Sequence, residues 1–276
     1  MRVYISVDME GVAGVVHVDQ TRRGTGTDFG TGRELMTMEA NAAALGAFDA
    51  GAKDVLINDS HGDMRNLVFD KLDPRVQVIT GSLKPFSMVE GIHDGRYDIA
   101  MFIGYHASAG SRAAILDHTY WGAVVSCMKV NGRVMNEASL NALVAGEAGT
   151  PVGLVAGDET CCIECKKLLG NVETVTVKWA IGRYSARSMH PEEARKVIRA
   201  GAAKAVKNVS RYKPFRMPAP YELEIKTHNA GMADSAGVMP GVKRVDGTTI
   251  RYKSANVREL FGAMLALIRL AGEGVV

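Results

Sequence analysis

The chain has 276 residues, which is long enough for one large or two modest domains with a buried core. Hydrophobic residues make up 47% of the sequence and charged residues 23%, proportions that are ordinary for a globular protein and exclude a disordered chain. The net charge is only +3, and the basic residues are scattered apart from a mild cluster between residues 199 and 213, which we interpret as a solvated helix face. The sequence therefore predicts no nucleic-acid partner.

The N-terminal residues MRVYISV lead directly into an expected strand, without the basic region, apolar run and cleavage site of a signal peptide. No uncharged apolar run approaches membrane-spanning length, so we expect no membrane partner and a cytoplasmic location. The cysteines fit the reduced thiols of that compartment: Cys127, Cys161, Cys162 and Cys165. The spacing of Cys162 and Cys165 matches half of a zinc knuckle or a redox pair, but no second pair follows. Buried helix thiols are the favoured interpretation.

Short apolar runs alternate with helical patterns over the first part of the chain. We expect strands at 2–7, 54–58, 76–80 and 98–104, a helix near 32–50 and a short helix after Pro85. This alternation predicts an α/β fold with a mostly parallel sheet and crossover helices.

The middle of the chain begins with a different pattern. Residues 119–130 and the turn Asn131-Gly132 predict a hairpin arm. The alternation then resumes with an expected helix at 137–148, a strand at 151–157, a helix from Asp158 and a strand at 173–179.

The C-terminal third has fewer alternating units. Its expected elements are a helix at 191–208, a Pro-rich connection at 211–220, strands at 221–227 and 248–254, and a final helix near 255–271. We therefore expect an α/β domain over 1–210 that carries the active site, followed by a smaller C-terminal α+β subdomain over 211–276.

Two carboxylates, Asp8 and Glu10, end the first expected strand with only Met9 between them. Side chains two residues apart on an extended chain project to the same side, so these charges repel each other. The pair is costly unless the site is wet or a cation lies between the carboxylates, and Gly11 and Gly14 leave room for something to approach. A solvated loop with an N-capping Asp and a metal site are both compatible with this pattern.

Further polar residues follow the other expected strands. The second strand runs into Asp59 and His61, the fourth runs into His106, and the loop beyond carries His118. In open α/β sheets, ligands collect beyond the carboxyl ends of the strands, so these side chains are expected to converge with Asp8. Oxygen and imidazole ligands without thiolate suit zinc, manganese or cobalt, often as two ions about 3.5 to 4 Å apart. Asp59 either orients a ligating imidazole or forms a turn.

Several segments, in this order, carry a resemblance that spans nearly the whole chain: SVDMEG (6–11), NDSHG (58–62), KPFSMVEG (84–91), GYHA (104–107), NEASLNA (136–142) and MPG (239–241). Together they resemble the dinuclear-zinc D-aminopeptidases of the DppA type. The resemblance implies a metallopeptidase on an α/β fold that releases N-terminal D-amino acids from short peptides through a zinc-activated water. It also implies a large ring-shaped homo-oligomer, with a decamer as a candidate size, whose sites face an internal channel.

Position by position, the resemblance implies two zinc ions per chain. Asp8 falls on the bridging carboxylate, Glu10 and His61 on the ligands of one zinc, and His106 and Glu137 on those of the other. Without the resemblance, Glu137 is an ordinary first-turn helix acid favoured by the helix dipole.

The family's catalytic histidine falls on His118. A histidine not needed as a ligand is suited to transfer a proton or to stabilise the oxyanion. A metal ligand and an ordinary core or surface histidine are the alternatives. For the whole protein, the alternatives are another dinuclear metal hydrolase, such as an amidase or phosphatase, and a metal-binding protein without turnover.

Overall fold

A computed structural model describes residues 1–24 and 27–275. Its larger sheet has the strand order β3-β2-β1-β4-β7-β8-β9 and is parallel except for the last strand, β9, which pairs antiparallel with β8. The strands are β1 (Arg2–Val7), β2 (Asp54–Asp59), β3 (Gln77–Ile79), β4 (Ile99–Tyr105), β7 (Val152–Asp158), β8 (Glu173–Gly182) and β9 (Ser185–Ser188). The expected parallel sheet is confirmed.

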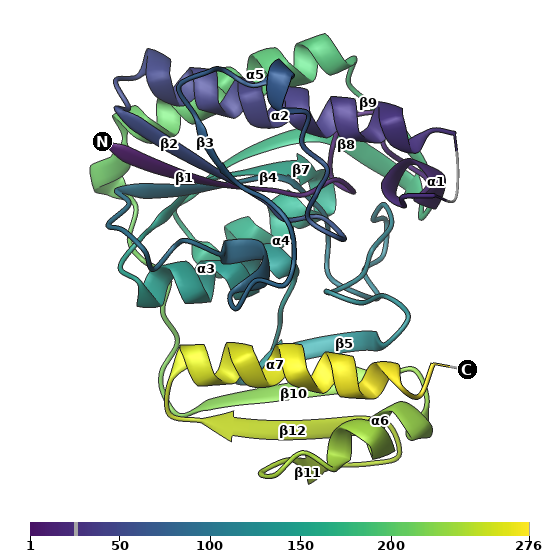
Figure 1. The fold of residues 1–276 in the computed structure, drawn as a ribbon. Helices are drawn as coiled ribbons and strands as arrows, with labels where there is room; N and C mark the ends of the chain where they lie inside the picture. Colours follow the sequence, from purple (N-terminus) through teal and green to yellow (C-terminus); the bar gives the residue numbers. More distant parts are fainter. Residues whose placement is uncertain (25–26, 276) are drawn as a thin grey trace.

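Helices cover both faces of this sheet (Figure 1). On one face lie α2 (Phe29–Asp49) and α5 (Pro191–Lys207), and on the other lie α3 (Glu137–Glu147) and α4 (Glu159–Leu169). The central strands are buried on both sides, which explains their continuous apolar sequences. On β1, for example, Val3 and Ile5 belong to the core beneath α2, whereas Tyr4 belongs to the core on the opposite face.

The second sheet is antiparallel and has the strand order β11-β12-β10-β5-β6. Its strands are β11 (Lys243–Arg244), β12 (Thr249–Ser254), β10 (Tyr221–Thr227), β5 (Val125–Val130) and β6 (Arg133–Val134). The amphipathic helix α7 (Val257–Gly272) lies between this sheet and α3, and α6 (Ala230–Gly237) packs beside it (Figure 1). Shorter helical segments are α1 (Val18–Thr21) and single turns at Phe69–Lys71, Ser87–Val89 and Val209–Arg211.

The predicted hairpin arm forms β5 and β6, joined by Asn131 and Gly132, which both have positive φ. Its partner is β10, where Ile225 pairs with Met128, so the smaller sheet takes strands from both sides of residue 210. The division into 1–210 and 211–276 stays a prediction, and residue 276 lies outside the described residues. The strand β9 and the helix α6 were not predicted.

None of the helices in the described parts of the chain is both long enough and apolar enough to span a bilayer.

Candidate metal centre

The candidate ligands meet at the carboxyl edge of the larger sheet. Asp8 follows β1, His61 follows β2, His106 follows β4, and Glu137 is the first residue of α3. Glu10 lies in the turn after Asp8, and His118 comes from the loop between β4 and β5. The structure therefore brings together the side chains that the resemblance implied as metal ligands and catalytic histidine: Asp8, Glu10, His61, His106, His118 and Glu137.

Close backbone contact between the ends of β1 and β4 sets this convergence. The amide of Gly11 donates to the carbonyl of Gly104 at 2.7 Å, and the amide of Asp8 donates to that of Ile103 at 2.8 Å. A Cβ at position 11 would lie 1.9 Å from the carbonyl oxygen of Tyr105, so no other residue fits there. Gly11 leaves room for neighbouring backbone, not for a ligand, which corrects the interpretation drawn from the sequence.

One group of side chains surrounds the His61 ring. Its Nδ1 atom lies 3.1 Å from Asp8 Oδ1 and 2.9 Å from Glu10 Oε2. All three side chains are at least nine-tenths buried, with 10%, 3% and 8% of the His61, Asp8 and Glu10 side chains exposed. Two buried carboxylates therefore face the same ring nitrogen.

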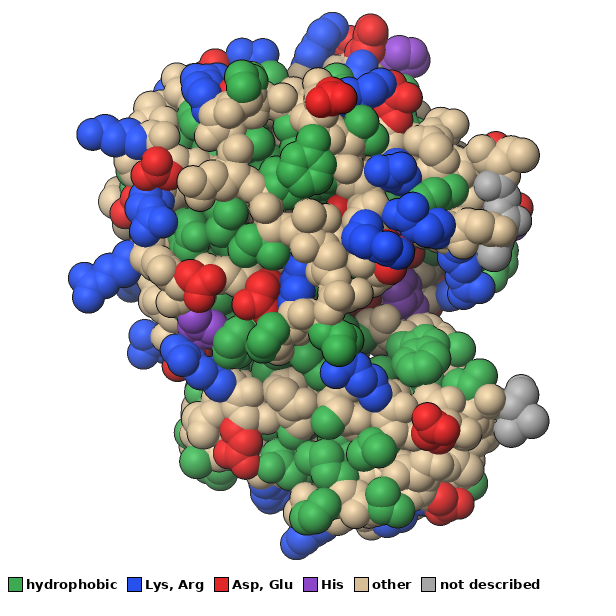
Figure 2. Space-filling model, viewed as in Figure 1, with side chains coloured by type: hydrophobic (Ala, Val, Ile, Leu, Met, Phe, Trp, Pro, Cys, Tyr) green, Lys and Arg blue, Asp and Glu red, His purple; other side chains and the backbone are tan. Residues whose placement is uncertain are grey.

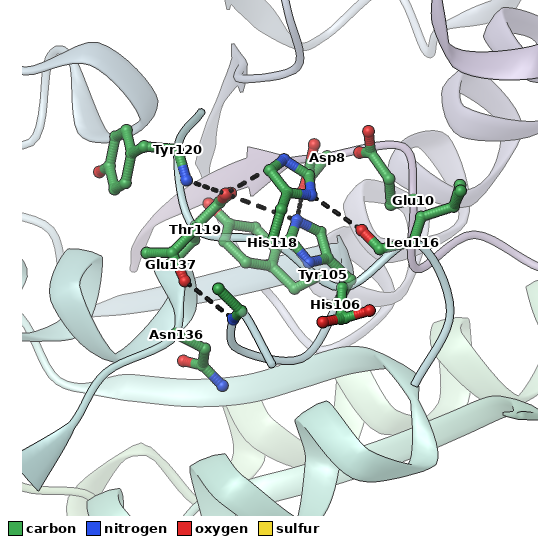
Figure 3. A network of polar contacts seen from close by, with 12 residues as sticks. Asp8, Glu10, Tyr105, His106, Leu116, His118, Thr119, Tyr120, Asn136 and Glu137 are labelled. Carbon is green, nitrogen blue, oxygen red and sulfur yellow. Dashed lines mark hydrogen bonds and ion pairs between the residues drawn. The ribbon is translucent and has the colours of Figure 1, made fainter. Parts of the chain in front are cut away.

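A second group lies on the other side of Asp8. The His106 Nε2 atom lies 3.4 Å from Asp8 Oδ2 and 3.5 Å from Glu137 Oε1, and His118 Nε2 is also 3.5 Å from Glu137 Oε1. The two imidazoles stack with their centroids 4.2 Å apart (Figure 3). The amide of Tyr120 donates to Glu137 Oε1 at 2.6 Å, which fixes that carboxylate. Asp8 thus contributes one oxygen to each group.

Each histidine of the site has one ring nitrogen bonded to a backbone carbonyl. His61 Nε2 lies 2.7 Å from the carbonyl oxygen of Thr21. His106 Nδ1 lies 3.0 Å from the carbonyl oxygen of Ala107, and His118 Nδ1 lies 2.9 Å from that of Leu116. A carbonyl oxygen only accepts, so these nitrogens carry the protons. In a neutral ring the second nitrogen then presents a lone pair to carboxylate oxygens, an arrangement that requires a proton or a metal ion between them.

Charge and burial shift the pKa values of these groups in opposite directions. Burial, together with the charge of Glu10, raises the pKa of Asp8 to about 7. Burial acts to lower the pKa of His106, but the carboxylates of Glu137, Asp8 and Glu10 together outweigh it and raise that pKa to about 10. In the same way, burial acts to lower the pKa of His61, but Glu10 and Asp8 together outweigh it and hold that pKa well above its usual range.

For His118, burial and the neighbouring charge of His106 both act to lower the pKa. Its side chain is 21% exposed, more than those of the other candidate residues. The His118 ring lies at the edge of the site with Nε2 directed at Glu137, so it is accessible from the cleft.

The residues present fit a metal ion. Asp8 Oδ2, Glu10 Oε2 and His106 Nε2 are buried and have no hydrogen-bond partner among the described residues. Two sets of potential ligand atoms lie within 4.8 Å of one another: Asp8, Glu10 and His106 form one, and His106, His118 and Glu137 form the other. Nitrogen and oxygen donors of this kind suit zinc, and cations would relieve both the orphaned atoms and the crowded carboxylates.

Two buried charged residues that the sequence did not nominate support the loop after β1. The Lys178 ammonium group, from β8, donates to the carbonyls of Glu10, Val12 (3.1 Å) and Val15 (2.5 Å). Glu39, from α2, accepts from the amide of Ala13 at 2.9 Å. No local pattern in the sequence marks either residue, because each is buried by contacts with a loop that is distant along the chain.

Asp59 does not orient an imidazole, so that alternative is wrong. Its carboxylate accepts from the amides of Asn66 at 2.5 Å and Leu67 at 2.9 Å, and folds the loop that carries His61. The turn-forming alternative is confirmed.

The predicted helix thiols are also confirmed. Cys161, Cys162 and Cys165 are free and buried on α4.

A cleft of about 890 Å³ leads to the site. Its floor includes Asp8, Glu10, His61, His118 and Glu137, and its rim includes Arg22, Arg23, Arg183 and Trp121. Figure 2 shows the hollow between the two lobes, with a histidine inside it and Lys and Arg side chains above it. The candidate ligands are therefore open to solvent through this cleft.

A family model described as D-aminopeptidase matches residues 1–266. The chain belongs to the D-aminopeptidase family. It is 38% identical over 275 residues to a D-aminopeptidase of Bacillus subtilis (strain 168), with 98% of each chain covered. A solved structure, described as the Zn-dependent D-aminopeptidase DppA from Bacillus subtilis, a self-compartmentalizing protease, matches with a TM-score of 0.94 and 36% identity. That match covers 99% of this chain and 98% of the other.

These comparisons confirm the resemblance seen in the sequence, and with it the α/β fold and the class of metal-dependent D-aminopeptidase. They favour neither another dinuclear hydrolase nor a metal-binding protein without turnover. Membership of the D-aminopeptidase family makes the cleft above Asp8 the candidate active site.

Proposed function

We propose that this chain releases N-terminal D-amino acids from short peptides and that it holds two zinc ions. The observation that carries the proposal is the orientation of the imidazoles. His61, His106 and His118 each bond a carbonyl through one nitrogen and direct the other nitrogen at buried carboxylates. The similar solved structure is that of a Zn-dependent enzyme.

We assign two ligand sets, which the family resemblance implies and with which the distances are compatible. Glu10 and His61 would hold one ion, His106 and Glu137 would hold the other, and Asp8 would bridge them through its two oxygens. Two ions held side by side in this way would resemble the two-metal sites of other hydrolases. Lys178 would keep Glu10 in place through its backbone carbonyl.

Hydrolysis of a peptide bond requires a nucleophile at neutral pH, a polarised carbonyl and a proton for the leaving amine. Bound zinc supplies the first two by lowering the pKa of water to about 7 and acting as a Lewis acid. We assign proton transfer to His118: its unprotonated Nε2 can accept the proton that the attacking water loses and pass it to the leaving amine, while Nδ1 remains bonded to the carbonyl of Leu116. Its position on the cleft floor, at the open edge of the site, supports this role.

Replacing His118 with Ala tests the assignment. The variant should keep both zinc ions and the fold but lose on the order of 10² to 10⁴ in the rate of D-amino acid release, as expected for general acid–base catalysis. His190→Ala, at an exposed helix N-cap far along the chain, is the matched control and should keep its activity. Loss of zinc from His118→Ala would make His118 a ligand, and near-normal turnover would remove it from the mechanism.

We further propose that short D-amino-acid-containing peptides are the substrates and that the chain assembles into a large ring-shaped homo-oligomer, with a decamer as the candidate size. Support comes from the description of the similar structure as a self-compartmentalizing protease. Large apolar side chains also lie exposed: Leu83 is 83%, Ile181 75% and Val238 75% accessible. Native mass spectrometry should show the assembly, and a monomer at micromolar concentration would contradict it. The cytoplasmic location remains a prediction.

A further inference from the structure

Glu164 lies on α4, outside the cleft, and its carboxylate accepts hydrogen bonds from two separate segments of the active site. Oε1 accepts from the hydroxyls of Ser108 at 2.8 Å and Ser111 at 2.7 Å. Oε2 accepts from the amide of Ser108 at 3.1 Å and from Asn136 Nδ2 at 2.8 Å. One half-buried side chain therefore satisfies donors from the β4–β5 loop and from the start of α3.

The first segment is the loop that connects His106 to His118. Ser108 follows His106 by two residues, and the loop has no regular secondary structure before His118. It includes residues with positive φ, at Ala113 and Leu116, so local backbone preference does not hold its shape. The contacts of Glu164 with Ser108 and Ser111 anchor its N-terminal end.

The second segment is the N-terminus of α3. Asn136 caps this helix, since its Oδ1 accepts from the amide of Ser139 at 2.8 Å. Its amino group donates to Glu164, so both ends of the Asn136 amide are fixed. Glu137 is the next residue, and its direction depends on how the first turn of α3 is held.

We propose that Glu164 is a positioning residue that ties the His118 loop to the start of α3 and so sets the geometry of His118 and Glu137. This inference rests on the proposed function. Glu164 touches neither the cleft nor any of the candidate ligands, and it acts through Ser108, Ser111 and Asn136. Residues that orient ligands in this way typically change metal affinity or activity about 10- to 100-fold when removed.

Glu164→Ala removes all four acceptor contacts at a half-buried position of α4, and Ala is well tolerated within a helix. We expect kcat for D-alanine release to fall about 10- to 100-fold with KM changed less than about threefold, because substrate-contacting residues are untouched. In chelator competition on the apoprotein, one of the two zinc ions should bind about tenfold more weakly. Glu159→Ala, an exposed carboxylate on the same helix, is the matched control and should match the wild type.

Glu164→Gln is the conservative rescue. A glutamine can accept from the Ser108 amide and Asn136 through its oxygen, while its amino group donates to the two serine oxygens. It should recover most of kcat and the zinc affinity.

Outcomes of three kinds would overturn the proposal. Glu164→Ala could lower the melting temperature but match Glu159→Ala in kcat and zinc affinity, which is the behaviour of a merely structural residue. Glu164→Gln could fail to rescue. If Glu164→Ala does not fold, Ser111→Ala removes a single donor, and unchanged kcat and zinc affinity in that variant would equally contradict the role. A wild-type protein that binds zinc but releases no D-amino acid would refute the proposed function, while the zinc-affinity measurement would still decide the role of Glu164.

Discussion

Glu39 should make the folded protein less stable as the pH rises towards neutrality. Glu39 is only 2% exposed. Its Oε1 atom accepts a hydrogen bond from the Ala13 amide at 2.9 Å, whereas its Oε2 atom is buried without a hydrogen-bond partner among the described residues. Burial raises the pKa of Glu39 from its ordinary value of 4.5 to about 7, although the charge of Lys178 opposes the change.

The sign follows from proton binding. Between pH 4.5 and about 7 the folded state keeps a proton on Glu39 that the unfolded state has lost. The free energy of unfolding therefore falls as the pH rises through this window. Below pH 4.5 both states keep the proton, so Glu39 does not make stability depend on pH there. Each pKa unit corresponds to about 1.4 kcal/mol, so the full loss is about 3 kcal/mol by pH 8.

Glu39→Gln keeps the acceptor for Ala13 but removes the ionisation. Urea unfolding of wild type and variant at pH 5, 6, 7 and 8 should show the variant gaining up to about 3 kcal/mol relative to wild type across the series. Glu159→Gln, at an exposed position on α4, should show no such trend. A flat difference for Glu39→Gln would refute the reasoning, because it would mean that Lys178 keeps Glu39 ionised in the folded protein.

Other substitutions test the remaining parts of the site. Asp8→Ala should lose both zinc ions in a metal assay, whereas His61→Ala should weaken chiefly one, and full zinc occupancy in Asp8→Ala would exclude a bridging role. Cys162→Ser and Cys165→Ser should keep zinc and activity, because these thiols are buried packing groups; loss of metal with the fold intact would contradict this. Lys178→Met leaves three backbone carbonyls without their donor, so denaturation should show a loss of about 3 kcal/mol or more; an unchanged unfolding midpoint would contradict it.

The sequence predicted much of the site because parallel strands bring their carboxyl ends to one edge of a sheet. That rule predicts that Asp8, His61 and His106 lie together. Glu137 begins a helix that is distant along the chain, and only the family resemblance nominated it. The position of His118 depends on an irregular loop, for which no local pattern exists.

What the sequence did not predict depends on long-range contacts. The hairpin pattern identified the strand β5 but not its partner β10, because strand pairing between distant segments leaves no local signature. Lys178 and Glu39 are buried because they bond the loop after β1, and no local pattern in β8 or α2 marks these two charged residues for burial.

We conclude that this protein is a zinc enzyme, and we propose that it is selective for D-amino acids. The most direct measurement combines the zinc content of the purified protein with the release of D-alanine and L-alanine from matched dipeptides. We predict about two zinc ions per chain and release of D-alanine alone, with activity lost on chelation and restored by zinc. Equal release of L-alanine, or full activity in zinc-free protein, would contradict the account.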